Sequence, residues 1–277
     1  VYTAPTVVQL GVATTVEFFG WNLGKNGAAR GAGAYSVASH KVLAVKPGTD
    51  QPVYRKASSV PLRGVSHYLP GLDTPVFLQT TGVPVVRAPL GANSPGTAME
   101  LNIPCDVSGT LGTRNEPAWY GIEVRRGEVI QLEAFAARAG SPVDLSIAIL
   151  TGDGERVLAN FTDEVLNAGG LRFPMNHPDP GGRWTAPEDG RYLLAIRDVI
   201  GAAQPDERRV YRLCLRREEA PFEVVAVGRR PGPSSGIVRR GGREMLDLLV
   251  QRRNGFNGEI LVRAADLPEG LECPDTW

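Results

Sequence analysis

Hydrophobic and polar residues alternate along several stretches of the chain, and this period of two is the pattern of a β-strand with one buried face. The clearest stretches are EVIQLEAFAARAG (128–140), GRYLLAIRD (190–198) and RVYRLCLRR (209–217). The side chains predicted to face inward are Ile130, Leu132, Ala134, Ala136, Tyr192, Leu194, Ile196, Tyr211, Leu213 and Leu215. On the other side of the last strand, Arg212, Cys214 and Arg216 are predicted to face outward.

Turn residues separate these strands. The 33 glycines and 22 prolines recur between short apolar runs, and Gly152-Asp153-Gly154 and Asp189-Gly190 border two of the clearest strands. Asn254-Gly255 and Asn257-Gly258 supply the positive φ values that tight hairpin turns need. Because helical periodicity is hard to find, we predict an all-β fold of tandem β-sandwiches.

The chain divides into three predicted modules, which suits its length of 277 residues. Residues 1–97 carry the strand patterns TTVEFFGWNL, HKVLAV and PVFLQT, and they end in the Pro/Gly/Ser-rich stretch RAPLGANSPGT (87–97), which we interpret as a linker. Residues 98–219 carry the clearest strands. Residues 220–277 are expected to form a third module that is cut short, because they are too few for a full sandwich.

A series of landmarks in the central segment follows a recognisable order. They are Ser108-Gly109, EVRRGE (123–128), AGSPVDLSIAIL (139–150), GERVLANFTD (154–163), APEDGRYLLAIRD (186–198) and YRLCL (211–215). In this order they resemble the bacterial pre-peptidase C-terminal domain, and the version found in large exported proteins of planctomycete-type bacteria looks closest. The resemblance implies a jelly-roll-like β-sandwich that is attached to secreted enzymes or surface proteins as an accessory module.

The flanking segments carry shorter motifs. APTVVQLGVATTVEFFGWNLG (4–24), with its G-x-N-L pattern, looks like the opening of an immunoglobulin-like domain. QRRNGFNGEILVRAADLPEGLECP (251–274) is similar to immunoglobulin-like modules that follow the central domain in such proteins. The resemblance therefore implies a central jelly roll between two immunoglobulin-like domains.

The charge balance argues against some classes of partner. Lys+Arg and Asp+Glu number 30 each, so no basic excess attracts nucleic acid or an anionic membrane. No stretch approaches the roughly 20 continuous apolar residues of a membrane span. Paired arginines such as Arg208-Arg209 and Arg216-Arg217 have acidic neighbours, and we interpret them as solvated sheet edges. Other protein chains or a cell-surface polymer are the predicted partners.

The three cysteines are Cys105, Cys214 and Cys273, and none lies in a zinc-binding spacing. Cys105 and Cys214 flank the central module, so a disulfide between them is one alternative. Free thiols in or near strands are the other alternative, because spacing alone does not establish the close approach that a disulfide requires.

Carboxylates near predicted strand ends are the candidate metal ligands. Calcium prefers hard oxygens gathered from turns, and Asp144, Asp153, Asp163 and Asp198 are candidates. Asp is also common in turns because it bonds the local backbone, and no calcium-binding loop motif is present. Many members of the resembling family have an acid just before the second strand, where Glu116 is not clearly equivalent. We therefore predict no cofactor, with calcium as the one alternative.

Tryptophans could form a platform that stacks on sugars, and Trp21, Trp119 and Trp184 are the candidates. Tryptophan more often anchors the core of a small sandwich, so burial is the alternative interpretation.

Catalytic motifs receive little support. GPSSG (232–236) matches a nucleophile elbow only formally, because prolines surround Ser234 and no helix follows. His40, His67 and His177 are far apart in sequence, and we expect them to be solvated loop residues.

We therefore predict a non-catalytic, extracytoplasmic structural or interaction module of a larger exported bacterial protein, working as a scaffold, spacer or adhesive surface. One alternative is a carbohydrate- or protein-binding accessory module of a secreted hydrolase. Another is a subunit of an envelope or filament assembly.

Overall fold

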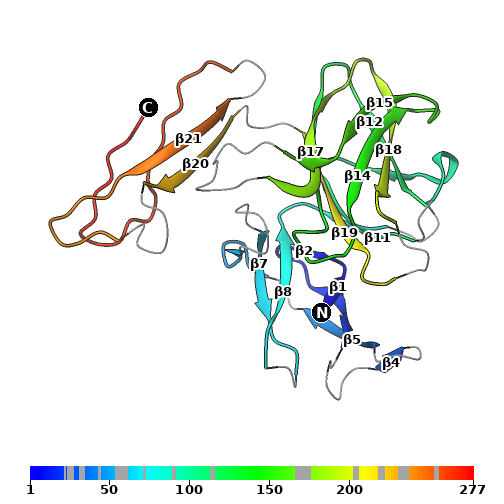
Figure 1. Cartoon of the computed structure of the whole chain (residues 1–277), viewed down its shortest axis with the longest axis horizontal. Coiled ribbons are helices and arrows are strands. Elements are labelled where there is room, and N and C mark those ends of the chain that lie inside the picture. Colours follow the sequence, from blue (N-terminus) through cyan, green and yellow to red (C-terminus); the bar gives the residue numbers. More distant parts are fainter. Residues whose placement is uncertain are drawn as a thin grey trace. The chain divides into compact units, whose positions relative to one another are not determined.

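The computed structural model describes residues 1–21, 23, 28–30, 35–42, 45–53, 62–70, 73–88, 92–112, 116–165, 176–201, 206–217, 222–229, 237–252 and 256–277. These residues form strands and one short 3-10 helix, η2 (Pro95–Thr97), and none of them lies in an α-helix (Figure 1). The predicted all-β class with several packed sheets is confirmed. No helix in the described part of the chain is long and apolar enough to cross a bilayer.

Two compact units make up the chain, Val1–Glu218 and Glu219–Trp277. The first unit contains four sheets. Two of these sheets lie in an N-terminal sandwich and two in a central sandwich.

The N-terminal sandwich consists of two four-stranded sheets. The first runs in the order β1 (Tyr2–Ala4), β3 (Thr14–Gly20), β5 (Tyr35–Val42) and β4 (Ala28–Arg30). The second runs in the order β2 (Val7–Gln9), β8 (Val76–Thr81), β7 (Leu62–His67) and β6 (Gln51–Val53). The buried apolar residues between them are Val8, Val16, Phe18, Leu23, Ala38, Val42, Leu69, Val76 and Leu78.

The central sandwich packs a five-stranded sheet on a six-stranded sheet. The five-stranded order is β10 (Met99–Leu101), β12 (Ala118–Val124), β18 (Gly190–Asp198), β14 (Leu145–Thr151) and β15 (Val157–Phe161). The six-stranded order is β16 (Asp163–Glu164), β17 (His177–Thr185), β13 (Val129–Phe135), β19 (Val210–Arg217), β11 (Cys105–Thr110) and β9 (Val85–Arg87). All ten side chains predicted to face inward lie in the core between these sheets.

The predicted turns have mixed outcomes. Gly152-Asp153-Gly154 joins β14 to β15, with Gly154 at φ +81°, and Gly190 begins β18 at φ +149°. The strand expected after Asn257-Gly258 is absent from described residues 256–261, where the chain finds no partner strand. Asn254-Gly255 lies outside the described residues. Turn residues therefore indicated a hairpin correctly only where a second strand was present to pair with the first.

The stretch interpreted as a linker packs against the central sandwich. β9 adds to the six-stranded sheet by pairing in parallel with β11. Further along, the carbonyl of Ala92 accepts a hydrogen bond from the backbone N–H of Trp119 at 2.9 Å. Two buried residues there, Leu150 and Leu193, form an apolar cluster with Trp119 on the outer face of the five-stranded sheet.

One glycine in the core leaves room for a tyrosine ring. A Cβ on Gly109 would overlap the ring and hydroxyl of Tyr211, which is fully buried and hydrogen-bonded to Tyr120. We expect Gly109→Ala to lower the free energy of unfolding by about 1–3 kcal/mol, the usual cost of overpacking a core. Denaturant unfolding measures this cost. Gly82→Ala, where the added methyl would meet nothing within 4 Å, is the control, and equal losses would contradict the prediction.

The second unit has a small sheet of β20 (Phe222–Gly228) and β21 (Leu246–Arg252), with an isolated bridge between Val262 and Thr276. Leu246 and Val250 on β21 are exposed. A two-stranded sheet is marginally stable alone, so this unit is the less well packed of the two.

Candidate functional site

A buried network of charges joins the two sandwiches of the first unit. Asp106 on β11 is fully buried, and its Oδ2 accepts a hydrogen bond from Arg212 Nε at 2.9 Å. Its Oδ1 accepts from Arg216 Nη2 at 2.5 Å. Arg212 also donates through Nη1 to Gln79 Oε1 on β8 at 3.1 Å. Because Gln79 belongs to the N-terminal sandwich, the network crosses the boundary between the two sandwiches.

Neutral polar groups extend the same connection. The Thr6 N–H donates to Ser108 Oγ at 2.8 Å, and the Thr6 hydroxyl lies 3.2 Å from the carbonyl of Tyr211. Arg216 Nη2 also reaches Thr81 Oγ1 at 3.3 Å. We call the residues Thr6, Gln79, Thr81, Asp106, Ser108, Arg212 and Arg216 the junction. Every buried polar atom of the junction named here has a partner, as a stable buried network requires.

An apolar cluster lies beside the junction. Leu62 of the N-terminal sandwich packs with Phe135 and Cys214 of the central one, and the guanidinium of Arg212 lies 5.0 Å from the Phe135 ring centroid. Arg212 and Cys214 do point away from the central core, as the alternation predicted. Arg212 is buried because the N-terminal sheets cover that face. The expectation of a solvated arginine edge is wrong for Arg209, which is buried and paired with Asp198.

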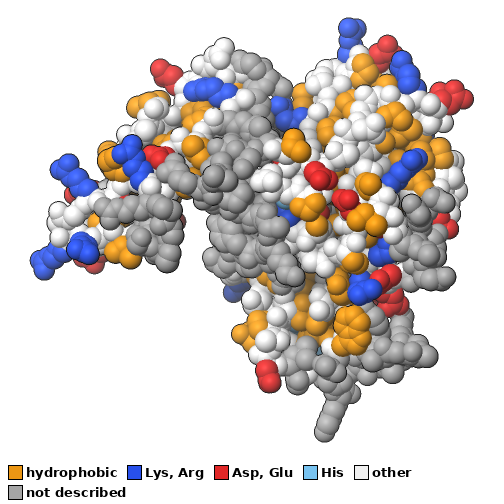
Figure 2. All heavy atoms as spheres, in the orientation of Figure 1, with side chains coloured by type: hydrophobic (Ala, Val, Ile, Leu, Met, Phe, Trp, Pro, Cys, Tyr) orange, Lys and Arg blue, Asp and Glu red, His pale blue; other side chains and the backbone are white. Residues whose placement is uncertain are grey.

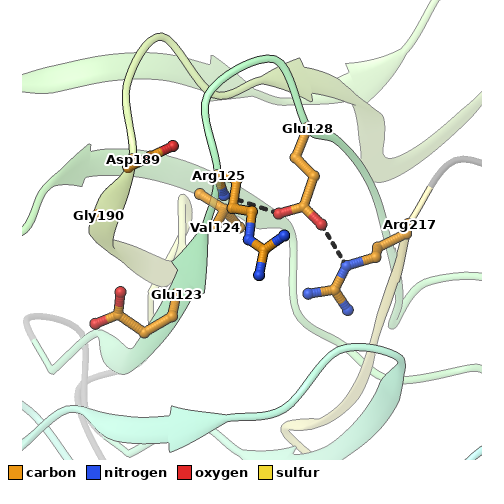
Figure 3. Close-up of a pocket in the computed structure, with 7 residues that line it drawn as sticks. All are labelled: Glu123, Val124, Arg125, Glu128, Asp189, Gly190 and Arg217. Carbon is orange, nitrogen blue, oxygen red and sulfur yellow. Dashed lines mark hydrogen bonds and ion pairs between the residues drawn. The ribbon is translucent and has the colours of Figure 1, made fainter.

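A polar cavity of about 680 Å³ lies at one end of the central sandwich (Figure 3). Glu128 is its organising residue: its carboxylate accepts from the Arg125 N–H at 2.9 Å and from Arg217 Nε at 2.6 Å. These two bonds hold the pKa of Glu128 below its ordinary value. Asp189 accepts from the Arg126 N–H at 2.7 Å. The carboxylates Glu128 and Asp189 therefore hold the β12–β13 turn, and the described lining residues include no serine, cysteine or histidine.

The predicted calcium ligands do not form one set. Asp144, Asp163 and Asp198 lie at the same end of the central sandwich, since Asp198 pairs with the first residue of β14 and Asp163 follows β15. Asp153 lies at the opposite end, beyond the seven residues of β14, and bonds to Thr151 Oγ1 at 2.5 Å. The structure therefore separates Asp153 from the other three candidates by the length of β14.

The remaining three carboxylates fit a cation poorly. Asp198 Oδ2 is already paired with Arg209 Nη2 at 2.7 Å, and its Oδ1 accepts from the Asp144 N–H at 3.2 Å. Within the described ranges, no group of three His, Cys, Asp or Glu side chains is placed to hold a metal ion. The geometry thus favours the turn-forming role of these carboxylates.

Asp144 experiences an unfavourable environment. Burial raises its pKa above 3.8, and the carboxylates of Asp163, Asp198 and Asp179 raise it further. Its Oδ1 atom is buried, and no described residue gives it a hydrogen bond. The charged form of Asp144 is therefore destabilising at neutral pH.

We expect Asp144→Asn to raise the melting temperature at pH 7. Because the folded protein holds the Asp144 proton more tightly than the unfolded chain, the wild type gains stability as the pH falls through the raised pKa toward 3.8. The advantage of the variant should therefore shrink in acid. Thermal unfolding between pH 3.5 and 7.5 measures this trend. Asp153→Asn, which keeps an acceptor for Thr151 but loses the negative charge that this bond stabilises, should show no gain, and an equal gain there would contradict the prediction.

Two of the three candidate tryptophans are buried. Trp119 is 6% exposed in the outer apolar cluster, and Trp184 is 8% exposed in the core, with its ring centroid 4.7 Å from that of Tyr192. Trp21 is 49% exposed and has the guanidinium of Arg208 5.8 Å from its ring centroid. Of the three, only Trp21 offers a surface ring.

Of the two alternatives for Cys105 and Cys214, the structure has the free thiols. Cys105 and Cys214 are both free and buried, and they lie on neighbouring strands where Cys105 pairs with Leu215 and Cys214 with Asp106. Cys105 belongs to the core of the central sandwich, whereas Cys214 lies in the cluster on the opposite face of the same sheet. Burial raises the pKa of the Cys105 thiol to about 11, so it is an unreactive core residue.

The histidines lie on strands, and the loop expectation is wrong. His40 is on β5, His67 on β7 and His177 on β17. His177 is buried, and its Nδ1 lies 2.9 Å from the Asp179 carbonyl. GPSSG, including Ser234, lies outside the described residues.

The fold defines an all-β protein of tandem sandwiches, and we compared it with known proteins. No family model matches the chain, and no curated protein matches it either. Among solved structures it is similar to the pre-peptidase C-terminal domain of a collagenase from Bacillus anthracis, at 12% identity and a TM-score of 0.30, covering 48% of this chain and 96% of that one.

A second solved structure has a comparable likeness. PliG from Aeromonas hydrophila, a periplasmic inhibitor of g-type lysozyme, is 12% identical with a TM-score of 0.29, covering 49% of this chain and 97% of that one. Both likenesses span about half of the chain. The flanking immunoglobulin-like modules and the planctomycete type stay predictions.

Proposed function

We propose that the chain is a non-catalytic structural module of an exported bacterial protein, in which residues 1–217 act as one rigid spacer. The junction carries the proposal. Asp106, Arg212 and Gln79 bond the central sandwich to the N-terminal one through groups that are buried on both sides. A spacer needs a fixed angle between its modules, and buried polar bonds with defined partners favour one arrangement over others.

The distribution of charge supports a structural role. The best-formed ion pairs of the first unit connect strands or modules, as Asp106–Arg212 and Asp198–Arg209 do. Carboxylates in the polar cavity of Figure 3 hold a turn. Formal neutrality of the chain favours partners other than nucleic acid.

Cooperative unfolding tests the spacer. If the two sandwiches form one rigid body, hydrogen-exchange protection in β5 and in β14 should be lost in the same thermal step of the whole chain. Loss of protection in β5 at a clearly lower temperature than in β14 would contradict the proposal. Fractionation of the cells that make the protein tests its location, and recovery from the cytoplasm would contradict export.

A polysaccharide-binding surface is the second candidate function, and the exposed ring of Trp21 favours it. Arg208 lies over this ring and is itself held by Asp206 through Nη2 at 2.6 Å. An aromatic face beside fixed polar groups is suited to a sugar ring, which has both apolar and hydroxyl surfaces.

Binding to insoluble cell-wall polysaccharide tests this candidate. Trp21→Ala should reduce retention at least about tenfold, the loss expected when about 1.4 kcal/mol of binding free energy disappears. Trp277→Ala is the matched control, because Trp277 is also exposed but belongs to the second unit. Equal retention of wild type and Trp21→Ala would exclude Trp21 from binding.

A further inference from the structure

Two histidines from different sheets meet inside the N-terminal sandwich. His40 is on β5 of the first sheet and His67 is on β7 of the second, and their ring centroids are 6.4 Å apart with the planes at 69°. Phe18 on β3 contacts both, stacked on His67 at 5.4 Å and edge-on to His40 at 6.1 Å. Because Phe18 is fully buried, both imidazoles reach into the apolar space between the two sheets.

The ring of His67 is poorly placed to carry a charge. Its Nε2 atom is buried, and no described residue forms a hydrogen bond with it. A neutral imidazole needs one donor and one acceptor, whereas the protonated ring has two donors and a positive charge. Protonation would therefore create a charged N–H group that is buried without a hydrogen-bond partner, and this raises the free energy of the folded state.

Among the residues that the structure describes, none supplies a compensating charge to His67. Across the sandwich β3 presents Phe18 and β5 presents His40, and the cross-strand neighbour on β8 is Val76. Burial lowers the pKa of His67, and the positive form of His40 lowers it further. Among the described residues, His40 is the titratable group that acts on His67.

We propose that the contact between His40 and His67 forms a pH-sensitive latch between the two sheets of the N-terminal sandwich, which holds while the His67 ring is neutral and weakens when that ring takes up a proton. The evidence for the latch is the set of ring contacts made by the two histidines. The latch does not depend on the proposed spacer function. It gives the N-terminal sandwich a contact between its two sheets that weakens in acid.

The direction of the pH effect follows from linkage. The folded protein binds the His67 proton less tightly than the unfolded chain, whose histidine has the ordinary pKa of 6.5. The stability that neutral His67 provides is therefore complete above about pH 6.5. It is lost as the pH falls from 6.5 toward the lower pKa of the folded state. Each proton taken up on unfolding raises the unfolding constant up to about tenfold per pH unit.

Denaturant unfolding of the whole chain between pH 7.5 and 5 tests the latch. His67→Phe removes the titrating ring and keeps an aromatic group against Phe18, so its unfolding constant should rise less steeply in acid than that of the wild type, by up to about tenfold per pH unit. Tyr68→Phe is the matched control, because Tyr68 is an exposed neighbour, and this variant should follow the wild type. Identical slopes for His67→Phe and wild type would overturn the proposal.

A second measurement covers the case in which His67→Phe does not fold. The chain has three histidines, so their ring C–H resonances can be followed separately by NMR in the wild-type protein. His67 should titrate with a midpoint below 6.5, and His40→Asn should move that midpoint upward. A His67 midpoint at or above 6.5 in the wild type would overturn the latch.

Discussion

Replacing Asp106 by alanine should lower the free energy of unfolding by about 3–5 kcal/mol, the usual cost of removing one partner of a buried ion pair. Asp106 is fully buried and accepts hydrogen bonds from Arg212 and Arg216. Without the carboxylate, the positive charge of Arg212 stays buried and keeps only its bond to Gln79 among the bonds of the junction. The loss is large because the charge left behind has little access to water.

A matched control separates this effect from the loss of an exposed pair. Glu100 pairs with Arg191 at 2.6 Å, and both side chains are substantially exposed. Glu100→Ala should therefore cost about 1 kcal/mol or less. Urea unfolding at pH 7 gives both values, and comparable costs for Asp106→Ala and Glu100→Ala would contradict the account of the junction.

Replacing Asp179 by alanine should have an effect of similar size, about 3–5 kcal/mol. Asp179 on β17 pairs with Arg138 Nε at 2.8 Å, and each of these side chains is 1% exposed. It also accepts the backbone N–H groups of Ala136, Ala137 and Arg138 at 2.7–3.0 Å. One carboxylate thus holds a whole turn and a buried guanidinium.

Asp179→Asn distinguishes the contributions of charge and shape. The amide keeps one oxygen acceptor but loses the negative charge, so we expect a loss smaller than that of Asp179→Ala and still larger than that of Glu100→Ala. Urea unfolding measures the series. A loss below about 1 kcal/mol for Asp179→Ala would show that Glu133 and the Ala134 carbonyl, which also accept from Arg138, are enough to hold its charge, and the prediction would be wrong.

Local pattern was enough to predict the strands of the central sandwich. Tyr211, Leu213 and Leu215 face the core because alternation is a property of each strand by itself. The same pattern placed Arg212 on the opposite face. It could not show that this face is covered, because that depends on which sheet packs there.

The contact between Asp106 and Arg212 at the junction could not be predicted from either strand alone. Asp106 and Arg212 are separated by 106 residues, and their contact exists only because β11 pairs with β19. One signal was available: Asp106 is a lone acid between Cys105 and Val107, which both face the core, and two outward arginines occur on another strand of the same module. Buried complementary charges could have been proposed from that pattern.

The histidine pair was missed for a related reason. His40 has the same strand phase as the inward Ala38 and Val42, and His67 has the phase of Val65. This strand phase is a signal that both rings face the core, but spacing along the chain suggests no contact between them. The packing of two separate sheets brings the rings together, and alternation within one strand carries no information about that packing.

The candidate calcium ligands show the same limit. All four aspartates lie near strand ends, as expected, but a strand has two ends. Strand direction in the five-stranded sheet places Asp144 and Asp198 together and Asp153 beyond the far end of β14. The order and direction of strands, which no single segment specifies, decided the composition of the group.

The distance between one probe on each sandwich tests the rigid spacer most directly. Spin labels at Ser39→Cys on β5 and Glu123→Cys on β12, both exposed sites, can be attached in a Cys273→Ser background because Cys105 and Cys214 are buried. Pulsed electron–electron double resonance should give one narrow distance distribution when the junction is intact and a broader one after Asp106→Ala. A broad or multiple distribution with the junction intact would contradict a rigid connection between the two sandwiches.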